Sequence, residues 1–460
     1  MRYISTRGRA PALNFEDAML TGLAIDGGLY VPETWPTMSA EEIAALSGLP
    51  YEEVAFRVMR PFIGDAFSDD EFRKIIDKAY SSFAHRLRCP LTQVRENVWA
   101  LELHHGPTLA FKDVAMQLIG QMFQAALSRR GERVTIVGAT SGDTGSAAIE
   151  AFRGLEAVDV FILYPHNRVS DVQRRQMTTP SEDNVHALAV EGDFDDCQAA
   201  VKAMFNDLEF RDAQKLAAVN SINWARVLAQ VVYFFTSAVA LGAPNRSISF
   251  SVPTGNFGDI FAGYVAKKMG LPIDRLIIAT NQNDILHRTV ASGAHEKQGV
   301  EPSTSPSMDI QVSSNFERLL FDLYDREGPA IEQLMGELSN DNGFVLSQGA
   351  HDRLRAEFDS ARFDEPAVNA LIGKYAKETG EVFCPHSAIG VGGAETATGP
   401  VVALATAHAA KFPAAVEDAC DISPALPPHM ADLFERAERV TVLPNDLNSL
   451  KAHISEKARS

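Results

Sequence analysis

The chain has 460 residues, with 60 Asp and Glu against 42 Lys and Arg, and a formal charge of −18. This length predicts two or three domains with a full-sized core, whose stability needs no metal or disulfide. The excess negative charge argues against nucleic acid and anionic membrane surfaces as partners.

Residues 1–95 are predicted to form a mostly helical N-terminal domain. The pattern of a capped helix lies at 14–20, and amphipathic stretches follow at 39–46 and 69–83. From about Val98 onward, short apolar runs alternate with Gly/Ser/Thr loops and helical segments. Residues 96–460 are therefore predicted to be α/β, with mainly parallel sheets flanked by helices in two lobes and a helical insertion around 325–380.

Two strand–loop–helix units in this region are built alike. The first runs from the apolar residues 134–137 into the loop 138–145, and the second from 248–252 into the loop 253–259. Such a loop exposes backbone N–H groups at the positive end of a helix, which suits a phosphate. Neither loop has the GxGxxG or GK[ST] pattern, so NAD and ATP are poorly supported. A tight turn without a ligand is the alternative for each loop.

Two further segments are interpreted from their composition. The uncharged stretch 227–243 has only 17 residues and ends in a Gly and Pro turn, so we expect a buried core helix rather than a membrane span. The polar segment 298–307, rich in Ser and Pro, is predicted to be a surface loop.

Lys112 is the candidate nucleophile, because apolar and aromatic residues surround it at the start of a predicted helix over 114–128. Burial there would lower its pKa and make the amine reactive toward a carbonyl. A surface lysine whose stem packs on apolar neighbours is the alternative. The adjacent His104 and His105 lack a third ligand at useful spacing, so no metal site is expected.

The four cysteines lie far apart, with no disulfide framework or zinc-binding spacing. The N-terminal residues 1–9 are polar and no apolar run follows them, so no signal peptide is expected. Both features predict a cytoplasmic protein.

Four motifs, taken in order, resemble the longer form of the threonine synthase family. They occupy 105–113, 140–145, 220–226 and 253–259, and similar segments at 14–32, 385–390 and 405–408 extend the resemblance over nearly the whole chain. The family is one of the tryptophan-synthase-β-like, fold-type-II pyridoxal-phosphate enzymes. Two positions depart from its pattern: Cys384 stands where Asp is expected, and Ala409 where Pro is usual.

The resemblance implies pyridoxal 5′-phosphate as cofactor. Lys112 would bind the cofactor aldehyde covalently and shuttle protons, and Thr406 would offer a neutral hydroxyl to the pyridine nitrogen. Asp143 is expected on the ring-hydroxyl side of the cofactor, with helix capping as the alternative. The cofactor phosphate would be held by backbone N–H groups of Gly255, Asn256, Phe257, Gly258 and Asp259.

The resemblance also assigns the substrate contacts. The substrate carboxylate would meet Thr140, Ser141 and Thr144, and the phosphate of O-phospho-L-homoserine would meet Asn220, Ser221 and Arg226. Arginine suits this role because its planar fork pairs bidentately with phosphate oxygens. An arginine that merely ends a polar face before the buried helix is the alternative for Arg226.

The implied activity is conversion of O-phospho-L-homoserine and water to L-threonine and phosphate, by γ-elimination and addition of water at the β-carbon. This reaction is the last step of threonine biosynthesis. A related threonine or serine dehydratase and a non-catalytic threonine-synthase-like protein are the alternatives. Beyond the small-molecule substrate, no nucleic acid, membrane or obligate protein partner is expected.

Overall fold

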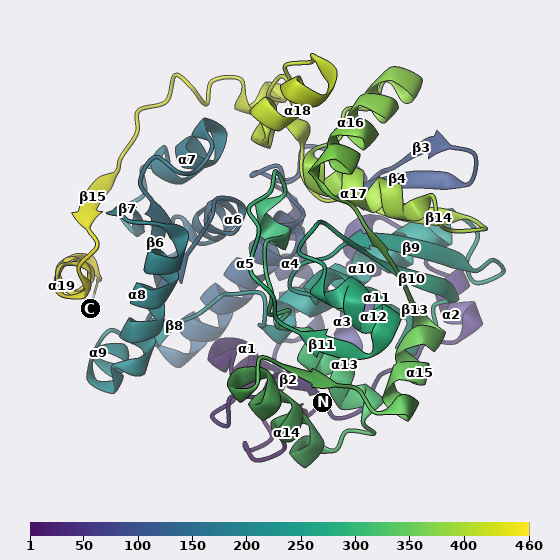
Figure 1. Ribbon diagram of the computed structural model, residues 1–460. Coiled ribbons are helices and arrows are strands. Elements are labelled where there is room, and N and C mark those ends of the chain that lie inside the picture. Colours follow the sequence, from purple (N-terminus) through teal and green to yellow (C-terminus); the bar gives the residue numbers. More distant parts are fainter. Residues whose placement is uncertain (460) are drawn as a thin grey trace.

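The computed structural model describes residues 1–459, in which two large sheets are flanked by helices and accompanied by two small two-stranded sheets (Figure 1). The predicted α/β architecture with mainly parallel sheets is confirmed. Among the described residues, no helix combines the length and the apolarity needed to cross a membrane.

The six-stranded sheet has the order β13-β10-β9-β14-β4-β3, and every neighbouring pair is parallel except β3 with β4. Its strands are β3 (Leu91–Arg95), β4 (Val98–Glu102), β9 (Ile248–Pro253), β10 (Ile273–Thr280), β13 (Phe358–Arg362) and β14 (Val401–Ala405). Because β3 belongs to this sheet, the sheet begins within the predicted N-terminal domain 1–95.

The segment 325–380, expected as a helical insertion, is only partly helical. It forms α14 (Gly328–Asn340), β12 (Gly343–Val345), α15 (Gln348–Glu357), β13 and α16 (Glu365–Thr379). The strand β13 adds an edge to the six-stranded sheet, where Phe358 and Ala361 are buried. Because this strand has only five residues, its apolar pattern in the sequence could not be distinguished from that of the neighbouring helices.

The five-stranded sheet is wholly parallel, with the order β15-β7-β6-β5-β8. Its strands are β5 (Val134–Ala139), β6 (Val158–Pro165), β7 (Val185–Glu191), β8 (Leu216–Ala217) and β15 (Thr441–Pro444). The associated helices are α6 (Asp143–Phe152), α7 (Asp171–Thr178), α8 (Phe194–Asn206), α9 (Leu208–Ala213) and α19 (Leu447–Lys457). The C-terminal segment therefore returns, yellow in Figure 1, to the edge of a sheet built earlier in the chain.

The N-terminal part is mostly helical, with one antiparallel ribbon. It contains β1 (Tyr3–Ser5), α1 (Phe15–Thr21), β2 (Tyr30–Pro32), α2 (Ala40–Ala44), α3 (Tyr51–Ile63) and α4 (Asp69–Tyr80). The predicted cap of α1 is Asn14, which accepts a hydrogen bond from the Asp17 N–H. Helix α3 was not predicted, because Pro50 precedes it and offers no capping side chain.

The interior holds α5 (Lys112–Arg130) and α10 (Trp224–Ala240), against which α3 and α4 pack. Nearly every residue of α10 is buried, so the predicted core helix is confirmed. The remaining elements are α11 (Gly258–Lys268), α12 (Ile285–Ser292), β11 (Ala294–Glu296), η1 (Pro306–Met308), α13 (Phe316–Leu323), α17 (Pro385–Ala394), η2 (Ala409–Lys411), α18 (Pro413–Cys420) and η3 (Pro428–Met430).

The two glycine-containing loops follow β5 and β9, which belong to different sheets. Ligands of open parallel sheets bind beyond the carboxyl ends of the strands. The fold therefore supplies one such loop from each sheet.

Candidate active site

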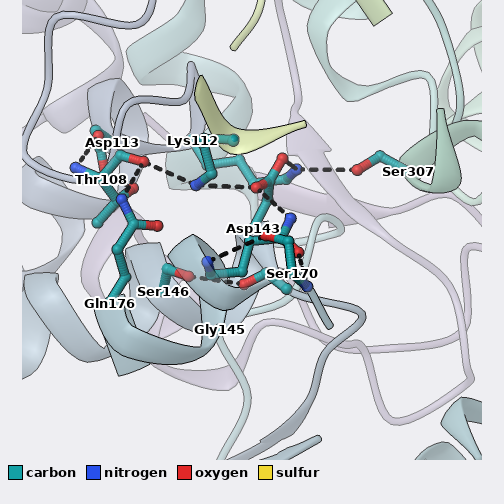
Figure 2. Close-up of polar contacts among 12 residues, drawn as sticks. Thr108, Lys112, Asp113, Asp143, Gly145, Ser146, Ser170, Gln176 and Ser307 are labelled. Atoms are coloured by element: carbon teal, nitrogen blue, oxygen red, sulfur yellow. Dashed lines mark hydrogen bonds and ion pairs between the residues drawn. The ribbon is translucent and has the colours of Figure 1, made fainter. Parts of the chain in front are cut away.

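Lys112 is the first residue of α5, and the residue is only 7% exposed. Its Nζ lies 3.6 Å from Asp143 Oδ2 and donates a hydrogen bond of 3.3 Å to Ser307 Oγ (Figure 2). Burial lowers the pKa of the Lys112 amine, although Asp143 acts in the opposite direction. The alternative of a surface lysine whose stem packs on apolar neighbours is therefore excluded. The amine has the environment expected of a nucleophile.

Asp143 is the first residue of α6 and lies between two buried lysines. Its Oδ1 is 2.9 Å from Lys411 Nζ and accepts a hydrogen bond of 3.0 Å from Gln173 Nε2. Burial by itself would raise the pKa of Asp143, but Lys411 and then Lys112 outweigh it and hold this pKa well below its usual range. Its side chain makes no capping hydrogen bond to α6, so the capping alternative is wrong.

Lys411 is the most prominent site residue that sequence reasoning missed. It is fully buried in η2, and its Nζ donates to the Thr108 carbonyl oxygen at 2.7 Å while pairing with Asp143. A buried ammonium group needs such partners. Lys411 comes three residues after His408 in the chain, and its local pattern does not distinguish it from a surface lysine.

Residues 298–302 of the segment predicted as a surface loop at 298–307 are exposed, whereas the end of the segment folds into the site. Its last residue, Ser307, accepts from Lys112 and donates its backbone N–H to His386 Nε2 at 3.2 Å. His386 is buried, which lowers its pKa to about 4 and keeps the imidazole neutral. Neither Ser307 nor His386 was predicted, because their approach depends on contacts between distant segments.

The loop from Gly255 to Asp259 joins β9 to α11. Within residues 1–459, no group accepts a hydrogen bond from the backbone N–H of Asn256, Phe257, Gly258 or Asp259. A Cβ at Gly255 would lie 2.5 Å from the Ser307 carbonyl oxygen, so only glycine fits there. These free N–H groups at a helix start fit a phosphate, as the cofactor requires.

The Asp259 side chain has a different partner from the free N–H groups of its loop. It is buried and accepts a hydrogen bond from the Tyr233 hydroxyl, while its Oδ2 has no partner within residues 1–459. Burial raises the pKa of Asp259 to about 7. Only its backbone is therefore available to a phosphate.

The second loop, at 140–144, is stabilised by hydrogen bonds to the side chain of Thr140. Thr140 Oγ1 accepts from the N–H groups of Gly142 and Gly145, each at 2.9 Å. The N–H groups of Ser141, Asp143 and Thr144 find no acceptor among residues 1–459. Together these groups form a second surface with free N–H groups beside Lys112, in which Thr140 shapes the loop.

Arg226 is buried on α10 without a carboxylate partner in the described part of the chain. Its Nη1 donates to the Val219 carbonyl oxygen at 3.2 Å, whereas its Nε has no acceptor there. Burial lowers the pKa of Arg226 to about 10, and its charge also lowers the pKa of Lys112. A buried guanidinium without an anion is costly, so this position suits an anionic ligand.

The other two residues predicted around this anion differ in position. Ser221 is half-buried, and its Oγ lies 3.5 Å from Ser314 Oγ. Asn220 is exposed, and the bond its carbonyl oxygen accepts from the Asn223 N–H is local.

Thr406 follows β14 beside Lys112. Its carbonyl oxygen accepts from the Phe111 N–H at 2.7 Å, and its own N–H donates to Ser387 Oγ at 3.0 Å. Cys384, which stands where Asp was expected, caps α17 because its sulfur accepts from the Ser387 N–H at 3.4 Å. The unusual residue therefore preserves the cap and the position of Thr406.

Three family models match the chain. They are described as "Threonine synthase N terminus" at residues 2–80, "Pyridoxal-phosphate dependent enzyme" at 84–347 and "Threonine synthase, C-terminal" at 387–454.

Individual proteins match over almost the full length. A threonine synthase from Pseudomonas aeruginosa is 56% identical, covering 99% of this chain and 98% of that protein. A pyridoxal-phosphate-bound threonine synthase structure from Brucella melitensis is 55% identical with a TM-score of 0.98, and each chain is covered completely. The yeast threonine synthase structure is 39% identical with a TM-score of 0.95, covering 99% of this chain and 98% of that one.

Proposed function

The chain belongs to the threonine synthase family, and we propose that it converts O-phospho-L-homoserine and water to L-threonine and phosphate. The observation that carries the proposal is the buried Lys112, held between Asp143 and Ser307 beside two loops with free N–H groups. The protein is a fold-type-II enzyme that uses pyridoxal phosphate.

We assign the cofactor contacts to residues that the fold gathers around Lys112. When bound, pyridoxal phosphate supplies an electron sink for carbanion chemistry. Lys112 would bind its aldehyde, and the backbone N–H groups of Gly255 to Asp259 would bind its phosphate. Thr406 would face the pyridine nitrogen with a neutral hydroxyl, which suits elimination chemistry.

We assign the substrate contacts to the two remaining polar surfaces. Ser141 and Thr144, with the free N–H groups of their loop, would bind the substrate carboxylate. Arg226 would pair with the substrate phosphate, assisted by Ser221 and, at the exposed edge, by Asn220. Lys411 and then Lys112 lower the pKa of Asp143 against the effect of burial, and we place Asp143 as the counter-ion that holds these two lysines.

We assign the proton transfers to Lys112. Burial favours the neutral form of its amine, which can remove a proton from the substrate α-carbon and serve the neighbouring carbon in turn. Ser307 and Asp143 hold the amine in place from two sides. Phosphate then leaves from the γ-carbon, and water adds at the β-carbon.

Two measurements test this function. The purified holoenzyme should release phosphate from O-phospho-L-homoserine and form L-threonine, and the Lys112→Ala variant should lose turnover. Lys202→Ala, a change of the same type at an exposed position on α8, should leave turnover unchanged. Full turnover by Lys112→Ala would contradict the proposed role of the lysine.

The products also separate the alternative functions. A threonine or serine dehydratase would release ammonia from threonine or serine, whereas a non-catalytic relative would bind cofactor and release neither product. The cytoplasm is the compartment we propose, and the four free thiols support it.

A further inference from the structure

Asn315 connects the segment that we assign to the substrate phosphate with the loop that we assign to the cofactor phosphate. Its side chain is fully buried, and its Nδ2 donates to the Ser221 carbonyl oxygen at 3.0 Å and to the Asn256 carbonyl oxygen at 2.9 Å. Its backbone N–H also donates to the Asn256 carbonyl oxygen, at 3.1 Å. A single amide group therefore joins two segments that are far apart in the sequence.

The Asn315 side chain also lies against the start of the phosphate-binding helix. A Cβ placed on Gly258, the first residue of α11, would be 3.4 Å from Asn315 Nδ2. Ser313, two residues before Asn315, donates from its Oγ to the Gly255 carbonyl oxygen at 2.6 Å. The segment 313–315 thus binds the carbonyl oxygens of the loop and leaves the N–H groups of that loop free for an anion.

Arg318 holds Asn315 in this orientation. It is fully buried on α13, and its Nη1 donates to Asn315 Oδ1. The Asn315 Nδ2 group is therefore the one that faces the Ser221 and Asn256 carbonyl oxygens. Its Nη2 donates to the Ile222 carbonyl oxygen at 2.6 Å and to the Tyr30 carbonyl oxygen at 3.0 Å. Through Tyr30, strand β2 of the N-terminal part is thereby linked to Arg318 and Asn315.

We propose that Asn315, fixed by Arg318, is the positioning residue that sets the distance between the cofactor-phosphate loop and the substrate-phosphate segment. The inference rests on the proposed function, because that function places a phosphate at each segment. Loss of the Asn315 amide frees both segments at once, so affinity for cofactor and affinity for substrate should fall together. Neither affinity should change if Asn315 serves only the stability of α13.

The experiment compares Asn315→Ala with Asn448→Ala, which removes an exposed amide on α19. Holoenzyme is dialysed against graded pyridoxal phosphate to obtain the cofactor Kd, and KM and kcat are measured with O-phospho-L-homoserine. In Asn315→Ala, loss of two buried hydrogen bonds should raise both Kd and KM by about tenfold, with kcat at saturation changed less than about threefold. Asn448→Ala should match the parent in all three quantities.

A second variant keeps the inference falsifiable if Asn315→Ala folds poorly. Arg318→Lys retains the buried charge but cannot span the Asn315, Ile222 and Tyr30 oxygens together, so it should raise Kd and KM in the same direction. A folded variant of either kind with unchanged Kd or unchanged KM would overturn the inference. If the parent binds cofactor but releases no phosphate, the proposed function fails, while the cofactor Kd still tests the role of Asn315.

Discussion

Lys411 Nζ lies 2.9 Å from Asp143 Oδ1, and both side chains are buried. The pair joins η2, near the end of the catalytic region, to the first residue of α6. Since Asp143 also contacts Lys112, one carboxylate lies between two buried lysine side chains.

Lys411→Met should destabilise the protein strongly. The change removes the nearer of the two lysines that contact Asp143 and the donor to the Thr108 carbonyl oxygen. Breaking a buried ion pair from one side costs about 3–5 kcal/mol. In urea unfolding, Lys451→Met is the control, because the side chain of its partner Asp207 is 40% exposed and pairs near the surface contribute at most about 1 kcal/mol. Equal losses in the two variants would contradict the role of the Lys411 pair.

Asp143→Asn should change the pH at which Lys112 becomes reactive. Asp143 raises the pKa of Lys112 against the effect of burial, so its neutralisation should lower that pKa further. The neutral amine is the form that captures the cofactor aldehyde. The rate of cofactor reloading, followed by absorbance against pH, should therefore reach half its maximum at lower pH in the variant. Asp171→Asn, at an exposed position of α7, should leave the midpoint in place.

Arg226→Ala should weaken substrate binding. The guanidinium is buried and has a free Nε, so we expect it to contribute a charge-assisted contact with the substrate phosphate. Loss of such a contact should raise KM for O-phospho-L-homoserine by about a hundredfold. Arg246→Ala, an exposed change beyond the end of α10, serves as the control. An unchanged KM in Arg226→Ala would assign the phosphate to other residues.

Asp259→Asn should stabilise the protein more as pH rises. Burial raises the pKa of Asp259 to about 7, above the value of an exposed carboxyl group. In the parent protein, the neutral form is favoured on folding, so stability is lost as pH increases from about 4 through about 7. The asparagine cannot ionise and still accepts from Tyr233. The difference in unfolding free energy should therefore grow from pH 5 to pH 8, on the order of a few kcal/mol. A difference independent of pH would show that Asp259 does not titrate in this window.

Much of the architecture was predictable because it depends on local patterns. Apolar runs followed by glycine-containing loops predicted β5 with α6 and β9 with α11, and those loops provide the free N–H groups. Most of helix α10 was predictable from the uncharged stretch 227–243, although the helix begins at Trp224, includes Arg226 and ends at Ala240. By contrast, α3 lacks a capping side chain and β13 is short, so neither gave a clear local signal.

The sequence by itself determined the α/β class, the candidate nucleophile Lys112 and the two glycine-containing loops, because each depends on residues that are neighbours in the chain. Only the tertiary structure decided which groups surround them. Lys411, Ser307, His386 and Asn315 reach the site from segments whose local composition resembles ordinary surface loops and helix starts. Their roles arise from burial, since charged and polar groups removed from water must find partners across the fold. The same physical reason makes Asp143, expected on the ring-hydroxyl side of the cofactor with helix capping as the alternative, the residue that contacts two buried lysines.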